Sequence, residues 1–237
     1  GLGGSVRYLR TTAEAHKYWK PFGNFVFSVG GEGGYIHSFE NSRGVGLDKI
    51  RLTDRFYLGE PQFPGFDIRG IGPRIQRQFY DANGNLVTDR NQVVDDSLGG
   101  RAYYLGRVEL EIPLGSGARE MGLRPSIFAV AGSVFGITRP QLNSLPNGMT
   151  RCRNDVTGAV TEFQNTNACA TGSTAIFSVP AFQEVFYGDT WKPRLSVGFG
   201  VNWRSPFGPF RIDIAKALIK HDGDDPKLFT FNVGTQF

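Results

Sequence analysis

Residues 194–204, RLSVGFGVNWR, alternate between apolar side chains and small or polar ones. This period of two is that of a β-strand, because successive side chains of a strand point to opposite faces of a sheet. Residues 104–112, YLGRVELEI, repeat the pattern with acidic and basic side chains on the polar face. The apolar members of the two stretches are Tyr104, Val108, Leu110, Ile112, Leu195, Val197, Phe199, Val201 and Trp203. The pattern predicts a sheet with one apolar face and one wet face.

Strand patterns of this kind recur along the chain. About seven stretches of roughly ten or more residues carry one. They are residues 5–20, 24–37, 102–112, 126–135, 194–204, 210–217 and 228–237. The composition agrees, with 32 glycines, 13% aromatic residues and only 2 methionines. We predict an all-β fold.

The connections between these stretches alternate between short and very long. KPFGN, PLGSGAREMG and SPFGP are short, whereas residues 38–100 and 136–193 form long loops. A soluble sandwich would also alternate along its strands, but it has no reason to keep this asymmetry. Short turns at one end and long loops at the other are typical of an outer-membrane barrel. Loops of about sixty residues are also uncommon inside a compact soluble domain.

In such a barrel the apolar face meets lipid and the polar face lines the interior. Trp19, Trp203, Tyr18 and Phe22 fall at strand ends, where an aromatic girdle would lie. An odd number of strands does not close a bacterial barrel, and lipid does not tolerate an unpaired edge. The chain also begins GLGGSVRYLR, without Met or a signal sequence. We therefore expect a fragment of an antiparallel transmembrane β-barrel.

Other functional classes find little support. The chain has 26 Lys and Arg against 22 Asp and Glu, and its basic residues are scattered, which disfavours nucleic-acid binding. His16, His37 and His221 lie far apart without an acidic or Cys partner at ligand spacing, so we expect no metal site. The sequence has no Gly-x-Ser-x-Gly and no glycine-rich phosphate loop. We expect no cofactor and no enzymatic activity.

The two cysteines, Cys152 and Cys169, lie close together in one polar segment. This favours a disulfide in an oxidising compartment over two free thiols. A zinc site would need more ligands than the segment offers, because no His lies near.

The chain ends KLFTFNVGTQF, with Phe229, Phe231, Val233 and Phe237 on one parity. We predict that this segment is a lipid-facing closing strand. Its terminal aromatic residue resembles the recognition signal that outer-membrane barrels present to their own assembly machinery.

Four motifs occur in an order that resembles one family, the BamA-type outer-membrane barrel assembly proteins with the related two-partner secretion transporters and organelle import pores. The motifs are DRFYLGE at 54–60, IGPR at 71–74, SLGGRAYYLGRVELEIPL at 97–114 and WRSPFGPFRIDIAKAL at 203–218. The resemblance implies that residues 1–237 form the C-terminal portion of a barrel of about sixteen strands. Periplasmic repeat domains and the N-terminal barrel strands are then expected outside this chain.

The resemblance also gives a role to FPGFDIRGIGPR, residues 63–74. In the family this sixth extracellular loop folds back into the lumen, and an arginine at its tip pairs with acidic residues on the following strands. Aligned without a gap, the tip arginine is replaced by Pro64; with a four-residue deletion it falls on Arg69. The residues of the expected tip and its base are Phe63, Pro64, Gly65, Phe66, Arg69, Gly70, Gly72, Pro73 and Arg74.

We favour the ungapped register and predict that Arg69 supplies the charge to Glu109, since a buried charge needs a partner. An exposed Arg69 is the alternative. The family's second acidic position is occupied by Val130. Arg211 and Asp213 share the inward face of one strand, two residues apart, and we expect them to compensate each other's charge.

The resemblance implies an integral protein of the bacterial outer membrane that folds and inserts nascent β-barrel proteins there. Its expected partners are nascent outer-membrane proteins, outer-membrane lipids and lipopolysaccharide, and the assembly lipoproteins of an insertase complex. Two alternatives stay open from the sequence: a two-partner-type secretion transporter and a passive porin.

Overall fold

The computed structural model describes residues 7–41, 43–81, 83–115, 122–163, 166, 168–206 and 208–234. Its described elements are strands and two short 3-10 segments, Leu52–Asp54 and Arg90–Gln92. No helix in this part of the chain has the length and apolar character of a membrane span. The predicted all-β fold is confirmed.

The chain divides into two compact units. The first, called here the wall unit, comprises Gly1–Arg74, Ser97–Arg139 and Tyr187–Phe237. The second, called the hairpin unit, comprises Ile75–Asp96 and Pro140–Phe186.

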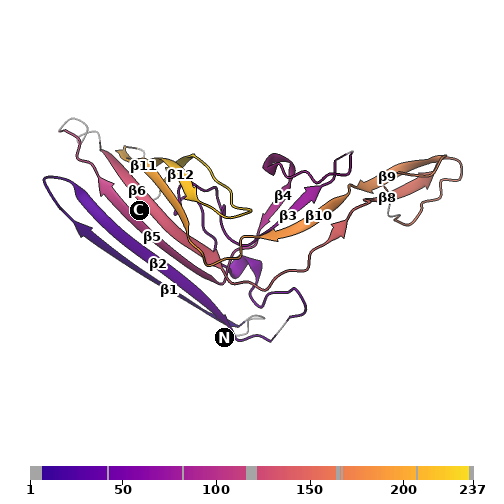
Figure 1. Cartoon of the computed structure of the whole chain (residues 1–237), viewed down its shortest axis with the longest axis horizontal. Coiled ribbons are helices and arrows are strands. Elements are labelled where there is room, and N and C mark those ends of the chain that lie inside the picture. The colour runs from indigo at the N-terminus through magenta and orange to yellow at the C-terminus, as the bar shows by residue number, and fades with distance from the viewer. Residues whose placement is uncertain are drawn as a thin grey trace. The chain divides into compact units, whose positions relative to one another are not determined.

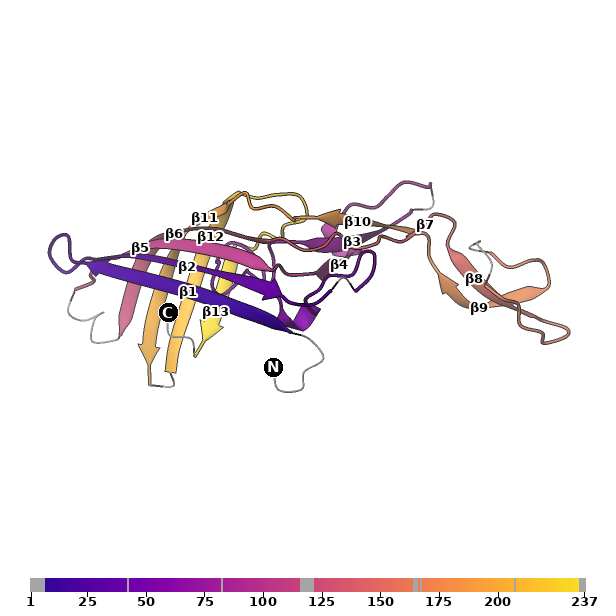
Figure 2. The same ribbon diagram turned by 90° about the horizontal axis from the view of Figure 1, so that it is seen from below.

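The wall unit is built on a seven-stranded sheet in which every strand runs antiparallel to its neighbours. The sheet order is β1 (Tyr8–Trp19), β2 (Val26–Ser38), β5 (Ala102–Glu111), β6 (Leu123–Phe135), β11 (Arg194–Ser205), β12 (Gly208–Ile219) and β13 (Phe229–Val233). Each of the seven predicted strands corresponds to one of these. Figure 1 shows the strands side by side, and Figure 2 shows how their direction changes across the sheet from β1 to β13.

The two faces of this sheet are opposite in character. On β12, Ile214 is 51% exposed while Asp213 is 1% exposed. On β6, Ile127 is exposed and Ser126 is buried. Water-soluble proteins rarely expose an apolar face of this extent, whereas lipid is the solvent that such a face needs. The other face, called the inner face, carries Glu109, Ser126, Ser196, Arg211 and Asp213.

Aromatic rings gather where the strands meet short turns. The Phe210 ring lies 5.6 Å from that of Trp203 and 5.9 Å from that of Phe231. At the other side of the sheet Trp19 lies 5.7 Å from Phe27. These positions suit a girdle at the level of the lipid headgroups.

Tyr18 does not belong to this group, and its predicted place in the girdle was wrong. Tyr18 precedes Trp19 on β1, so the two side chains point to opposite faces. In the β1–β2 register Tyr18 pairs with Ser28, and both line a cavity on the inner face.

The hairpin unit shows that the predicted long loops contain regular structure of their own. A four-stranded sheet has the order β4 (Val94–Ser97), β3 (Arg74–Phe79), β10 (Phe182–Tyr187), β7 (Ser144–Leu145). A two-stranded sheet pairs β8 (Met149–Asn154) with β9 (Ser173–Val179). Strand β3 escaped prediction because its buried positions are Arg74, Gln76 and Gln78, so its alternation carries no hydrophobic signal.

Cys152 of β8 is joined to Cys169 by a disulfide that spans a sequence separation of 17 residues. The bond ties the segment between β8 and β9 back to β8. A closed loop of this length restricts the unfolded chain and contributes about 3 kcal/mol to stability.

We expect Cys152→Ser to lower the free energy of unfolding of the hairpin unit by about 3 kcal/mol, because the unfolded segment regains its conformational freedom. Limited proteolysis of the full-length protein should then cut between β8 and β9 faster, while the wall unit keeps its wild-type resistance. Reduction of the wild-type protein should reproduce the effect. Equal cleavage rates in the oxidised wild type and the variant would contradict it.

Candidate functional site

Residues 55–74, called here the strap, lie against the inner face of the sheet. The rings of Phe63 and Phe66 are fully buried and meet edge to face at 5.1 Å. The hydroxyl of Ser196 on β11 donates a hydrogen bond to the Pro64 carbonyl at 2.6 Å. The core of the wall unit is therefore the contact between the strap and the sheet. Its other buried apolar members include Ile71, Leu105, Phe128, Val130, Val134 and Ala215.

Gly65 allows the backbone of the strap to approach the sheet closely. It adopts a φ of +100°, which favours glycine. A Cβ at this position would lie 2.8 Å from Cβ of Ser196 and 3.5 Å from Cβ of Ala215. Both the conformation and the space exclude a larger residue at the tip.

The base of the strap is fixed by a contact within the strap and by contacts with the rest of the wall unit. Arg74 is buried, and its Nη2 donates to the Arg69 carbonyl at 2.6 Å. The Pro73 carbonyl accepts a hydrogen bond from the Leu98 amide at 2.8 Å. A Cβ on Gly72 would lie 2.4 Å from Cγ1 of Val134. The GPR motif therefore forms the point where the strap rejoins the wall.

A network of charges surrounds Glu109 on the inner face. Its Oε2 accepts from Arg107 Nε at 2.8 Å, and its Oε1 accepts from Arg211 Nη2 at 3.1 Å and from the Ser126 hydroxyl. Arg211 also donates to the Asp213 carboxylate at 2.9 Å. Since Arg211 and Asp213 are almost fully buried, the network satisfies charges that would otherwise be costly.

Gly200 makes room for this network. A Cβ on Gly200 would lie 2.3 Å from Asp213 Oδ1 and 2.9 Å from Arg211 Nη2. Small residues on the inner face of β11 therefore leave space for the long side chains of β12.

The predicted pair between Arg69 and Glu109 is not formed, and that prediction was wrong. The Arg69 guanidinium lies over the Tyr57 ring, 4.5 Å from its centroid, and Arg69 is exposed. Residues 63–66, rather than 68–70, occupy the tip against the sheet. Because the tip holds Pro64 instead of a cation, Glu109 takes its charge partners Arg107 and Arg211 from the wall itself. The expected compensation between Arg211 and Asp213 occurs within this larger network.

Val130, at the position of the family's second acidic residue, is fully buried in the same cluster as Phe63 and Phe66. An apolar side chain at this position of β6 matches a tip without an arginine. The contact between the strap and β6 is therefore apolar on both sides.

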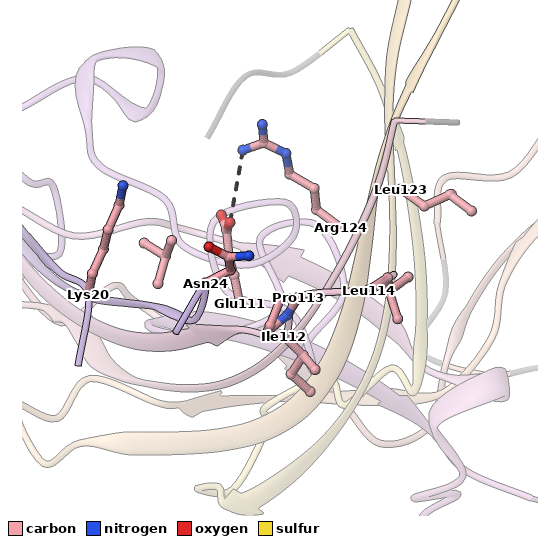
Figure 3. A pocket seen from close by; sticks show the side chains of 9 residues that line it. Lys20, Asn24, Glu111, Ile112, Pro113, Leu114, Leu123 and Arg124 are labelled. Carbon is pink, nitrogen blue, oxygen red and sulfur yellow. Dashed lines mark ion pairs between the residues drawn. The ribbon is translucent and has the colours of Figure 1, made fainter. Parts of the chain in front are cut away.

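Two hollows lie along the inner face and the turn ends of the wall unit. A cavity of about 330 Å³ is lined in part by His16, Glu32, Arg107, Glu109 and Arg211. A second, of about 300 Å³, is shown in Figure 3, where Glu111 lies between Lys20 and Arg124. Arg124 Nη1 is 3.9 Å from Glu111 Oε2. Charges of both signs give these hollows a wet lining.

The arrangement positions the strap on the inner face through apolar packing and hydrogen bonds. Within the described ranges, His, Cys, Asp and Glu side chains form no group of three or more that could hold a metal ion. Arg107, Glu109, Arg211 and Asp213 are engaged with one another, whereas Glu32 stands opposite Glu14 on the same face. The apolar packing and hydrogen bonds hold the strap against the inner face of the sheet.

The predicted closing strand is β13, which pairs with residues 210–214 of β12. Phe229, Phe231 and Val233 are exposed on the apolar face, while Thr230 is buried on the inner face. Phe237 lies outside the described residues. In the part of the chain that the structure describes, β1 and β13 each have one strand neighbour.

Comparisons with known proteins agree with this architecture. A family model described as the Omp85 superfamily domain matches residues 1–237. The chain is 29% identical over 238 residues to the outer membrane protein assembly factor BamA of Neorickettsia risticii (strain Illinois), covering 100% of this chain and 23% of that protein. It is 26% identical over 244 residues to the protein of the same name from Neisseria meningitidis serogroup B (strain ATCC BAA-335 / MC58), covering 99% and 24%. The chain thus spans about a quarter of the length of these curated relatives.

The solved structures include a similar fold. The crystal structure of BamA from Haemophilus ducreyi lacking POTRA domains 1–3 matches with a TM-score of 0.60 at 19% identity, covering 97% of this chain and 35% of that one. This likeness supports the interpretation of the open seven-stranded sheet as part of a larger barrel.

We expect Glu109→Ala in the full-length protein to lower the free energy of unfolding by about 3 kcal/mol, because Arg107 and Arg211 lose the carboxylate that they share. Urea unfolding in detergent micelles measures this change. Glu111→Ala is the matched control from the same strand and face; its ion pair is longer and its side chain is 34% exposed, so it should cost less than about 1 kcal/mol. Equal losses in the two variants would contradict the role given to Glu109.

Gly65→Val should displace the strap from the inner face, since the new side chain collides with Ser196. Trypsin should then cleave after Arg69 at least tenfold faster than in the wild type, which corresponds to about 1.4 kcal/mol of lost docking. Gly136→Ala serves as the control, because Gly136 also has a positive φ, of +88°, but has open space around it. Unchanged cleavage in Gly65→Val would mean that the strap tolerates a larger tip.

Proposed function

The chain belongs to the Omp85 superfamily, and from this premise we propose that the protein of which it forms part folds and inserts nascent β-barrel proteins into the outer membrane. The observation that carries the proposal is the match along the whole chain to two curated assembly factors, at 29% and 26% identity.

The exposed face of the sheet and the family both support a location in the outer membrane. The apolar face is exposed along β6, β11, β12 and β13 and needs lipid, while Arg211 on the inner face is paired with Glu109 and Asp213. We propose that outer-membrane lipids and lipopolysaccharide are what this face contacts.

The geometry favours assembly over passive diffusion. A porin needs an open water channel, whereas here the strap packs its two phenylalanines onto the inner face as the core of the wall unit. In the described part of the chain, β13 lies at one edge of the sheet. An edge strand is suited to accept a client strand by pairing.

No catalytic side chain is needed for this activity, since the folding of the client supplies the free energy. Nascent outer-membrane proteins are the clients, and assembly lipoproteins act with the full-length protein.

Depletion of the full-length protein in its host tests the proposal. We expect a broad fall in unrelated outer-membrane barrels, with their unfolded forms accumulating in the periplasm, as measured by quantitative proteomics of both fractions. Re-expression of the wild-type protein should restore the barrels. Loss of a single secreted protein with other barrels intact would identify a dedicated transporter, and loss of small-solute uptake alone would identify a porin.

A further inference from the structure

We propose that Lys227 is a positioning residue that fastens the closing strand β13 to the strap, so that the docked strap determines where the closing strand begins. The coupling is a property of this chain's own contacts; only its consequence for client insertion rests on the proposed function.

The backbone of the strap runs beside the segment that leads into β13. The Asp67 amide donates to the Asp225 carbonyl at 2.8 Å, and the Asp225 amide donates to the Gly70 carbonyl at 2.7 Å. The Lys227 amide donates to the Gly65 carbonyl at 3.1 Å. A short antiparallel pairing therefore joins the tip of the strap to the residues immediately before β13.

Side chains reinforce this pairing at the first residues of β13. The Lys227 ammonium lies 3.0 Å from Glu60 Oε2 and 3.1 Å from Asp67 Oδ1, both of which belong to the strap. The same Glu60 oxygen accepts a hydrogen bond from the Thr230 hydroxyl at 3.1 Å. Because Thr230 lies within β13 and is 1% exposed, Glu60 contacts the closing strand itself. Lys227 and Thr230 share one carboxylate of the strap.

The far end of the same connection is fixed to the wall. Arg194 at the start of β11 donates from Nε and Nη2 to the two oxygens of Asp224, at 3.0 and 3.1 Å, and both side chains are fully buried. The remaining N–H groups of Arg194 donate to the carbonyls of Gly188 and Thr190 and to the Ser133 hydroxyl. With all its donors satisfied, this pair is a rigid anchor.

These contacts add to the pairing of β13 with β12. Among the described residues that pairing covers 229–233, and backbone hydrogen bonds from Ala215 to Leu228 and from Gly234 to Pro209 extend it by one residue at each end. The connection from Asp224 to Lys227 is thus held by the wall at one end and by the strap at the other. A strap that leaves the inner face takes away the second support and frees the start of the closing strand.

Hydrogen–deuterium exchange of the purified full-length protein in lipid nanodiscs tests the coupling directly. In Lys227→Met we expect amides of β13 and of residues 60–70 to exchange about threefold to tenfold faster, as befits loss of a partly exposed ion pair. Amides at the centres of β6 and β11 should keep their wild-type rates. Lys227→Arg, which retains the charge, should exchange as the wild type does.

Two further variants sharpen the comparison. Lys220→Met removes an exposed lysine from the same connection and should leave β13 unchanged. Lys227→Glu should raise exchange beyond Lys227→Met through repulsion of Glu60 and Asp67. Unchanged exchange at β13 in Lys227→Met would overturn the proposal, as would a uniform rise that includes β6 and β11.

The outcome is independent of the proposed function. Faster exchange confined to the strap and β13, together with normal levels of unrelated barrels after depletion, would support the coupling and reject the assembly role. Unchanged exchange together with a broad loss of barrels would reject the coupling and support the assembly role. If both hold, Lys227→Met should also alter client barrel levels although the protein itself is folded and present at wild-type amounts.

Discussion

The packing of the strap against the inner face is the contact on which the wall unit depends. A transmembrane barrel points its apolar residues outward to lipid, the reverse of a soluble protein. Its interior side therefore has no hydrophobic core of its own. Phe63, Phe66 and Ile71 supply that core from a loop, and they meet apolar residues that interrupt the polar inner face. The strap is therefore a structural part of the wall, which explains why so short a segment is rich in both aromatic residues and glycine.

The charges of the inner face follow from the same constraint. Arg211 and Asp213 are nearly as buried as the phenylalanines. Buried charges are stable only when they are paired and hydrogen-bonded. Glu109 stands between Arg107 and Arg211, so the wall compensates its charges without a cation from the strap. This independence allows Pro64 to occupy the tip, and the contact between strap and wall is then mainly apolar.

How far the sequence predicted the structure depends on the kind of signal each part carries. The seven wall strands were predictable because their lipid-facing side chains are apolar, so that apolar and polar residues alternate along each strand. Strand β3 was not, since it buries Arg74, Gln76 and Gln78, whose burial cannot be inferred from hydropathy. The predicted pairing of Arg69 with Glu109 was wrong. Pro64 stands at the tip in place of a cation, and Glu109 is compensated by arginines of the wall.

The ion pair of Arg194 with Asp224 shows a further limit. Its partners are thirty residues apart in sequence, one at the start of β11 and the other in the connection between β12 and β13, so neither periodicity nor motif spacing connects them. The pair nevertheless fixes the connection before β13. Gly72 lies in a short motif and has a demanding backbone geometry, with a φ of +102°, whereas the charge pair leaves no local pattern in the sequence.

The position of β13 depends on contacts from two directions. In the described part of the chain it is an edge strand that pairs with β12 through its backbone. The strap acts on the residues just before this strand and, through Glu60, on Thr230 within it. These strap contacts lie on the inner face, so they help to place the strand without using the backbone groups of its outer edge. Backbone pairing and side-chain contacts therefore fix the strand from different sides.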